Sequence, residues 1–466
     1  MKPCRIHLFF CWAKSDFSSD AWGKGAVIST AEDFKALFAN IAIDNATTIS
    51  NRYGEVTRAL NLQFRDTESR TANSLQVGSY GRYTAIKCIS DLDMLYIMPN
   101  SCWSDYKDGG QYKLLRKAAD AILARYPNTE VYPDTLVVVV QYSNFKIEVQ
   151  PVFEDKDGNF IYPYTKNGGS WRTTKPRAEL KATSDVDNAK NGNLRRLAKM
   201  ARAWKNKHGV PMGGLLLDTL AHNFINSTAD HDATSFGSCG KMMRGFLAYL
   251  ADQPKQDRYG ALGSGQHVKV HKAFQSKAKK GLKLVDDALD AGEEAKANAR
   301  WRKVFGRGYP LAESTELKKS YIVEAGYQAR NTEEFIEDEF PVDIRYALKI
   351  DCEVSQNGFR SIFLRASRTA GLRRLNVFKS KSLKFFVNDH NIPGTSHLYW
   401  KVLNRGPIAI ERDMVRGQIE KDSGTRTKFE RSNFRGEHVV DCYAVQNGVV
   451  VAKDRIHVPI IDASES

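Results

Sequence analysis

The sequence predicts an α+β protein in which a mixed sheet and helices come first and a small all-β unit comes last. Three observations support this prediction. Apolar and polar side chains alternate through residues 91–97 and 144–153, as they do on half-buried strands. Apolar residues recur at helical spacing through residues 30–60 and 112–126. After about residue 340, short alternating segments separated by Gly and Asn turns replace the helical pattern.

We expect the first 26 residues to lie outside the fold. Their apolar run IHLFFCW is much shorter than the ~20 residues that a membrane-spanning helix needs. A basic residue precedes it, but no cleavage site of small residues follows, as it would in a secretory signal peptide. Residues 1–26 are therefore interpreted as a disordered extension or a product of start-site choice, and no membrane partner is expected.

The helical pattern begins at Thr30, which with Asp33 three residues later resembles a helix cap. The apolar positions that follow predict a long spine helix packed behind the sheet, and a second helix is expected over Tyr112–Tyr126. The uninterrupted apolar run Leu136–Val140 predicts a strand buried on both faces. Pro151 indicates that strand pairing ends nearby, because proline cannot donate to a ladder.

Two aspartates share one face of the strand at residues 91–97. Because side chains alternate along a strand, Asp91 and Asp93 point the same way, while Leu92 and Met94 point into a core. Two carboxylates on one face suit hard divalent cations, which prefer oxygen ligands. A two-metal site would activate an attacking hydroxyl and stabilise a pyrophosphate leaving group. The alternative is a surface strand followed by an Asx turn.

Two further features strengthen the metal hypothesis. Gly78 and Ser79 form a turn before the strand, where backbone N–H groups and a hydroxyl can hold the phosphates of a nucleotide. Glu148 lies on the polar face of the strand at residues 144–153 and is the candidate third carboxylate, able to bind metal or take a proton. The alternative for Glu148 is an exposed position on an edge strand.

A basic helix is predicted at residues 194–205. Its apolar residues recur at positions i, i+3, i+7 and i+10 and form a stripe that ends at Trp204. Arg195, Lys199 and Arg202 line another face, which is either a solvated surface or a binding face for phosphate.

Together these residues resemble the polymerase-β-type nucleotidyltransferases, and over residues 27–310 the chain is similar to the bacterial cGAS/DncV-like group, the CD-NTases. The segments WRTTKPRAE at 171–179, LRRLAKMARAWK at 194–205 and PMGGLLLDTL at 211–220 resemble the middle region of that group. The chain departs from the group by carrying Glu148 where relatives often have Asp. It also has Gly213 and Gly214 where many relatives have a Ser near a phosphate.

The resemblance implies roles for the candidate residues. Asp91, Asp93 and Glu148 would hold two Mg²⁺ ions, for which Mn²⁺ can substitute. Gly78, Ser79 and Lys199 would contact the triphosphate of a bound nucleotide, with Arg195 or Arg202 assisting. The expected parts are a nucleotidyltransferase lobe at 27–210, a helical lobe at 211–332 that completes the nucleotide cleft, and a β-rich domain at 333–466.

The last of these parts is similar to the adenylyl/guanylyl and SMODS C-terminal sensor domain, AGS-C, over residues 399–419 and 438–445. That resemblance implies an activating ligand. Several basic residues could form an anion site there, although a solvated surface explains most of them. They are Arg405, Arg412, Arg416, Lys428, Arg431 and Arg435. Trp400 is expected in the core rather than as a stacking platform.

Composition sets further bounds on the protein. The net charge of +15 favours anionic partners such as nucleotides, nucleic acid or acidic surfaces, and it leaves the choice among them open. The seven scattered cysteines form no CxxC pair or Cys/His cluster, so neither a disulfide framework nor a zinc site is expected. His267 and His271 are interpreted as a solvated helix face. These features predict a reduced, cytoplasmic protein.

The leading functional hypothesis is a synthase that condenses nucleoside triphosphates, ATP or GTP among them, into a cyclic di- or trinucleotide messenger. The resemblance places it in bacterial anti-phage signalling of the CBASS type, with a separate effector protein that responds to the product. One alternative is transfer of a single nucleotide to a small molecule, protein or RNA end. Another is an inactive scaffold whose C-terminal module binds nucleic acid or another ligand.

Overall fold

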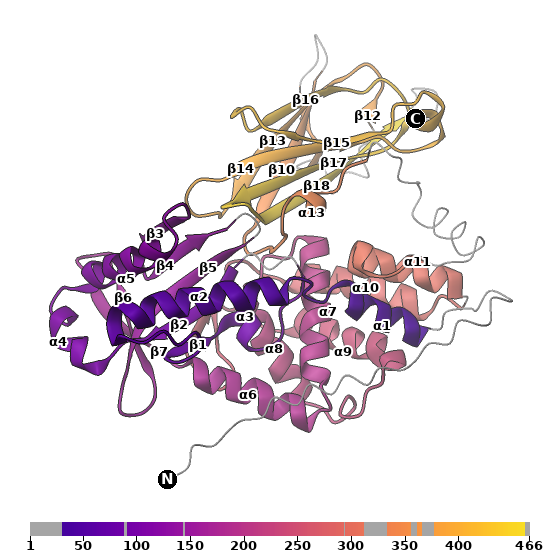
Figure 1. Cartoon of the computed structure of the whole chain (residues 1–466). Coiled ribbons are helices and arrows are strands. Elements are labelled where there is room, and N and C mark those ends of the chain that lie inside the picture. The colour runs from indigo at the N-terminus through magenta and orange to yellow at the C-terminus, as the bar shows by residue number, and fades with distance from the viewer. Residues whose placement is uncertain are drawn as a thin grey trace, which may run out of the picture.

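The structure is a computed structural model, and it describes residues 30–87, 91–142, 145–292, 294–311, 333–355, 361–365 and 377–461. The chain forms a sheet lobe, a helical lobe and a β-sandwich (Figure 1). This arrangement confirms the predicted α+β class with an all-β C-terminal part. The expected extension at 1–26 and the expected boundary near residue 332 lie outside the described residues.

The first lobe is built on a seven-stranded mixed sheet. Its central order is β1-β2-β5-β4-β3, and β6 and β7 continue from β5. The strands are β1 (Ser74–Gln76), β2 (Asp91–Ile97), β3 (Glu130–Asp134), β4 (Val137–Gln141), β5 (Lys146–Glu154), β6 (Phe160–Tyr164) and β7 (Ser170–Thr174). Only β2 and β5 pair in parallel within this sheet, and they lie side by side.

Two long helices cover one face of this sheet. They are α2 (Ala46–Arg65) and α5 (Gln111–Arg125), which includes nearly all of the expected helix at 112–126. Val56 and Leu60 of α2 and Ala118 of α5 form one core with Leu92 and Met94 of β2. The strand therefore turns its apolar side toward the helices and leaves its aspartates on the opposite side.

The prediction that pairing ends near Pro151 is confirmed for the two central neighbours of β5, because the pairing with β4 ends at Val149 and the pairing with β2 ends at Val152. The strand itself does not end there. Strand β5 continues to Glu154, and Pro151 lies opposite Tyr96 in the parallel ladder with β2. On its other edge, β5 pairs with β4 as far as Val149 and with β6 only from Phe153. Pro151 falls between these two partners, where the ladder needs no donor.

The second lobe is helical, and its main helices are α6 (Pro176–Ala189), α7 (Asn193–His208), α8 (Gly214–Asn226), α9 (Cys239–Asp252), α10 (Gln275–Leu289) and α11 (Glu294–Phe305). The expected single spine helix is divided in two, because α1 (Thr30–Asn40) ends before α2 begins. Phe34 of α1 packs edge-on against Trp301 of α11 with ring centroids 5.2 Å apart. Helix α1 therefore belongs to the core of the helical lobe, and only α2 lies behind the sheet.

A small hairpin interrupts the helical lobe. It consists of β8 (Arg258–Gly260) and β9 (His267–Lys269). The expected helix carrying His267 and His271 is wrong, because His267 begins strand β9 and His271 follows that strand. Shorter helices are α3 (Gly78–Gly81), α4 (Trp103–Tyr106), α13 (Ile336–Glu339) and α15 (Pro407–Glu411), with 3₁₀ turns at Asn100–Cys102, Phe236–Ser238 and Gly306–Gly308.

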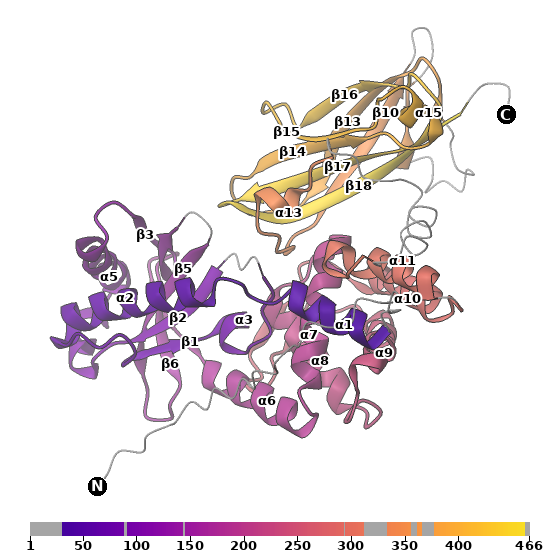
Figure 2. The same cartoon turned by 45° about the vertical axis from the view of Figure 1, so that its right-hand side comes forward.

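The C-terminal part is a sandwich of two sheets (Figure 2). One sheet has the order β11-β10-β13-β16 and the other β12-β18-β17-β14-β15. The strands are β10 (Leu348–Ser355), β11 (Ile362–Phe363), β12 (Val377–Phe378), β13 (Ser382–His390), β14 (His397–Leu403), β15 (Arg416–Lys421), β16 (Thr427–Arg431), β17 (Gly436–Gln446) and β18 (Val449–Ile461). Trp400 is buried in the core between the sheets, as predicted.

Of the helices in the described ranges, none is both long enough and apolar enough to cross a membrane.

Candidate active site

Strands β2 and β5 bring the three predicted acids together. In the parallel ladder, Asp93 lies opposite Glu148 and Asp91 lies opposite Lys146. One carboxylate oxygen from each of Asp91, Asp93 and Glu148 lies within 4.8 Å of the others. Strand β5 is central in the sheet, so Glu148 is not on an edge strand. The arrangement can hold a divalent cation through oxygen ligands alone.

The three carboxylates of this cluster repel one another when they are ionised. Burial of Asp93, together with the nearby carboxylates of Asp91 and Glu148, raises the pKa of Asp93 to about 8. A third negative charge is therefore costly without a compensating cation. A hard divalent cation would supply that compensation, so the donor set fits such an ion.

Gly78 permits the turn to approach the aspartates. Its φ is +64°, and a Cβ built on it would lie 1.8 Å from Oδ2 of Asp93. The Val77 N–H donates to the Asp93 carbonyl at 3.0 Å, which joins the turn to β2. The Ser79 carbonyl accepts from the Thr84 N–H at 3.0 Å. The Gly-Ser turn is therefore held directly beside the acid cluster.

Two cations that the sequence analysis did not identify also contact this cluster. Lys146 Nζ forms an ion pair with Glu148, its neighbour two positions along the same face of β5. Arg345 Nη2 donates to Oδ1 and Oδ2 of Asp91 at 2.8 and 2.6 Å. Strand alternation could have identified Lys146. No local signal points to Arg345, because it lies 254 positions from Asp91.

The three basic residues of α7 have different surroundings. Burial and the positive charge of Arg195 lower the pKa of Lys199. No ion pair of Lys199 is found among the described residues. Arg195 Nη1 pairs with Asp187 at 2.9 Å, and its Nε donates to the Arg82 carbonyl. Of Lys199 and Arg195, Lys199 is thus the better placed to accept an anionic ligand.

Arg202 is buried in a structural ion pair. Its Nη1 and Nη2 donate to the two oxygens of Asp218 at 2.6 and 3.0 Å. Arg82 and Thr84 also donate to Asp218, at 2.9 and 2.8 Å. Burial alone would raise the pKa of Asp218, but Arg202 and Arg82 hold it below its usual range. This conformation commits Arg202 to joining α7 and α8 rather than to a phosphate, and the sequence analysis missed the Asp218 network.

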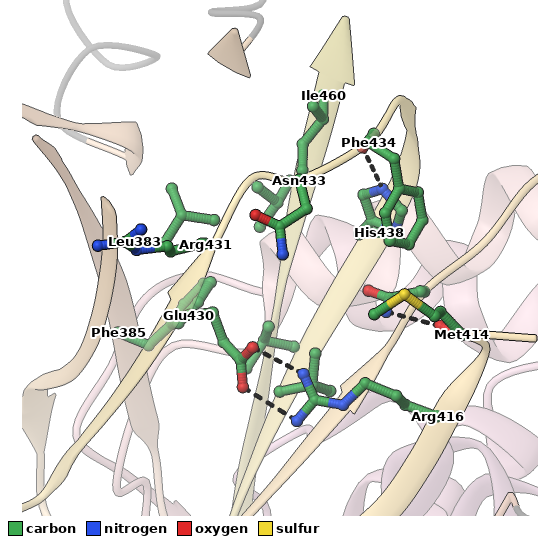
Figure 3. Close-up of a pocket in the computed structure, with 14 residues that line it drawn as sticks. Leu383, Phe385, Met414, Arg416, Glu430, Arg431, Asn433, Phe434, His438 and Ile460 are labelled. Atoms are coloured by element: carbon green, nitrogen blue, oxygen red, sulfur yellow. Dashed lines mark hydrogen bonds and ion pairs between the residues drawn. The ribbon is translucent and has the colours of Figure 1, made fainter. Parts of the chain in front are cut away.

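The sandwich contains a cavity of about 50 Å³ lined in part by Phe385, Arg416 and His438 (Figure 3). Arg416 forms two hydrogen bonds with Glu430 at 2.6 and 3.0 Å, which neutralise its charge. The His438 ring contacts the Phe434 carbonyl at 3.2 Å. In this conformation Arg416 is thus already paired within the sandwich.

Comparison with protein families matches two domains to the chain. The Second Messenger Oligonucleotide or Dinucleotide Synthetase domain, SMODS, matches residues 28–187. The Adenylyl/Guanylyl and SMODS C-terminal sensor domain matches residues 330–461. The first match includes the whole acid cluster, and the second includes Arg345.

The match with this chain covers most of the length of each of two curated relatives. A cyclic AMP-AMP-AMP synthase of an Acinetobacter strain is 22% identical over 318 residues, which is 64% of this chain and 90% of the relative. A probable cyclic nucleotide synthase of Bacillus cereus is 18% identical over 275 residues, 51% of this chain and 82% of the relative.

Among solved structures, the Escherichia coli MS115-1 CdnC:HORMA-deltaN complex matches with a TM-score of 0.48 and 14% identity. The match covers 60% of this chain and 98% of that chain. The Bradyrhizobium diazoefficiens CD-NTase CdnG in complex with GTP matches with a TM-score of 0.45 and 13% identity, over 64% of this chain and 98% of that chain. On the evidence of the two domain matches and the Acinetobacter relative, the chain is a nucleotidyltransferase of the CD-NTase group with a C-terminal AGS-C sensor domain.

Proposed function

We propose that the protein condenses nucleoside triphosphates into a cyclic di- or trinucleotide and releases pyrophosphate at each step. The observation that carries this proposal is the convergence of Asp91, Asp93 and Glu148 beside the Gly78 turn, within the segment that matches the SMODS domain. The name of the Acinetobacter relative makes a cyclic trinucleotide of adenosine monophosphate the first product to test for.

In this proposal each residue acts from the position that its strand or helix provides. Asp91, Asp93 and Glu148 would hold two Mg²⁺ ions, or Mn²⁺ in their place. Bound metal of this kind activates a hydroxyl nucleophile and neutralises charge on a phosphate. Gly78 and Ser79 would hold the triphosphate through the turn. Lys199 would supply a positive charge to the same phosphates from α7.

Cyclisation requires the same residues to act again. The acids would orient a 3′-hydroxyl toward an α-phosphate, and Glu148 would accept the hydroxyl proton, so that the new P–O bond forms as the bond to pyrophosphate breaks. A linear intermediate that turns around would then present its own triphosphate to the Gly78 turn. One site would thus perform successive transfers without a second set of acids.

We further propose a place for the protein in the cell. Its substrates are cytoplasmic nucleotides, and the product would be read by a separate effector protein in CBASS-type anti-phage defence. The AGS-C domain would respond to an activating ligand. The free thiols of the described cysteines Cys102, Cys239, Cys352 and Cys442 are compatible with a reducing compartment.

The experiment is mass spectrometry of the products after incubation with all four ribonucleoside triphosphates and Mg²⁺, with and without phosphatase treatment. A phosphatase-resistant cyclic product is expected from the parent protein and none from the Asp91→Ala, Asp93→Ala double variant. The matched control is Asp105→Ala with Asp108→Ala, because both acids are exposed and lie outside the cluster. Product from the first double variant would contradict the site.

Phosphatase-sensitive linear or adduct products would instead favour transfer of one nucleotide to another acceptor. No turnover with Mg²⁺ or Mn²⁺, together with salt-sensitive binding of nucleic acid, would favour the scaffold alternative. The proposal predicts neither result.

A further inference from the structure

Arg345 reaches from the C-terminal part of the chain into the acid cluster. Its Nη2 donates to both carboxylate oxygens of Asp91, at 2.8 and 2.6 Å. The Asp91 side chain is only 18% exposed, so water screens this pair less than it screens a surface ion pair. Arg345 is therefore bound at one of the carboxylates that would hold metal in the proposed function.

The guanidinium and a divalent cation compete for the same carboxylate. Each is attracted by the negative charge of Asp91, and each repels the other at short range. A metal bound through Asp91 would share at least one oxygen with Arg345, because the guanidinium contacts both. The competition is sharpened because the hydrogen bonds of Arg345 to Asp91 are charge-assisted.

The segment that carries Arg345 is attached to α7. Lys205 Nζ donates to Asp343 Oδ1 at 2.6 Å, and Asp343 Oδ2 in turn accepts from Arg345 Nε at 2.6 Å. Asn206 provides a second attachment, because its side-chain oxygen accepts from the Ile344 N–H at 3.1 Å. These contacts orient the guanidinium toward β2.

The same segment is attached to the sandwich on its other side. The backbone N–H groups of Asp343 and Arg345 donate to the carbonyls of Val450 and Val451 in β18, at 3.1 and 2.9 Å. Displacement of β18 relative to α7 would therefore pull on the segment at residues 341–346. The position of the sandwich and the occupancy of Asp91 are linked through one short piece of backbone.

We propose that the C-terminal domain inhibits the enzyme by placing Arg345 on Asp91 in competition with the divalent metal. Withdrawal of residues 341–346 by movement of the sandwich would expose Asp91 and allow metal to load. This inference rests on the proposed function, since it assigns the regulation of that same site. In this proposal the AGS-C domain acts on the acid cluster through the contact of Arg345 with Asp91.

The test measures Mn²⁺ binding to the full chain by electron paramagnetic resonance, without nucleotide or turnover. The Arg345→Gln variant should bind Mn²⁺ about tenfold more tightly than the parent, because it removes the competing cation and its charge-assisted bonds. Arg345→Lys keeps the charge and should lie between them. The matched control is Arg416→Gln, which removes a doubly bonded arginine of the same domain and should bind as the parent does.

Hydrogen exchange gives a second measurement on the unaltered protein. Saturating Mn²⁺ should speed exchange of the Asp343 and Arg345 amides, because metal loading displaces the segment from β18. Equal or weaker Mn²⁺ binding by a folded Arg345→Gln variant would overturn the proposal, as would unchanged exchange in the unaltered protein.

The outcomes separate this inference from the proposed function. Tighter Mn²⁺ binding by an Arg345→Gln variant that itself makes no cyclic product would support the competition and refute the synthase activity. A cyclic product together with unchanged Mn²⁺ affinity in the variant would support the activity and refute the competition.

Discussion

Replacement of Gly78 by alanine tests the approach of the turn to Asp93. The new Cβ would lie 1.8 Å from Asp93 Oδ2, whereas real Cβ contacts are essentially never under 3.0 Å. The carboxylate would have to retreat by about 1.2 Å, the difference between these two distances. A misplacement of about 1 Å at a reacting centre can lower a rate by roughly 100-fold, so we expect a loss of that order in kcat/KM.

The matched control is Gly168→Ala. Gly168 also has a positive φ, +82°, but an added Cβ meets no atom within 4 Å. Both substitutions impose left-handed strain on alanine, which costs about 1–2 kcal/mol. Unfolding in urea should therefore show a loss of about that size for Gly168→Ala and a larger loss for Gly78→Ala.

The assay is the rate of cyclic product formation from ATP with Mg²⁺, resolved by anion-exchange chromatography. Gly168→Ala should retain the parent rate, because its loop does not touch the acids. Equal rates for Gly78→Ala and Gly168→Ala would refute the reasoning, since strain alone would then explain every effect. A Gly78→Ala variant that keeps the parent kcat/KM would refute the proposed use of Asp93.

Three further substitutions test the roles of individual charged side chains in stability and in catalysis. The pKa of Asp93 is raised to about 8 in the folded protein, so the metal-free protein should lose stability as pH rises from about 4 to 8. Asp93→Asn should remove that loss and raise Tm at pH 8 by a few degrees while abolishing synthesis. An unchanged Tm at pH 8 would contradict this prediction. Arg202→Met should cost about 3 kcal/mol in urea unfolding, because Asp218 loses its doubly bonded partner; a loss below about 1 kcal/mol would argue against the buried pair. Lys199→Gln should raise KM for ATP about tenfold with little change in unfolding free energy, as expected for a charged hydrogen bond to phosphate, and an unaltered KM would remove Lys199 from the site.

Local patterns explain why much of the site could be predicted. The two-residue period of a strand places Asp91 and Asp93 on one face whatever the rest of the chain does, and the same period applies to Glu148. Which strands become neighbours is a separate matter, and the parallel pairing of β2 with β5 brings the third acid to the first two. The roles assigned to these acids remain predictions, although their convergence is a feature of the structure.

Helix predictions failed where the partner of an apolar face was not local. The spacing at Phe34 indicated a helix, but not that α1 would pack on Trp301 instead of behind the sheet. Pro151 correctly signalled a missing donor, but the strand continues because its partner changes from β4 to β6 at that point. The expected boundaries of the three parts stay predictions.

The sequence by itself determined the α+β pattern, the shared face of the two aspartates, the glycine turn and the basic helix, because each depends on residues a few positions apart. Only the tertiary structure decided how the charges pair. Arg202 is committed to Asp218, Lys146 to Glu148, and Arg345 reaches Asp91 across 254 positions of sequence. Such pairings depend on how lobes and sheets dock. The local pattern of residues along the sequence does not show which distant residues are brought into contact.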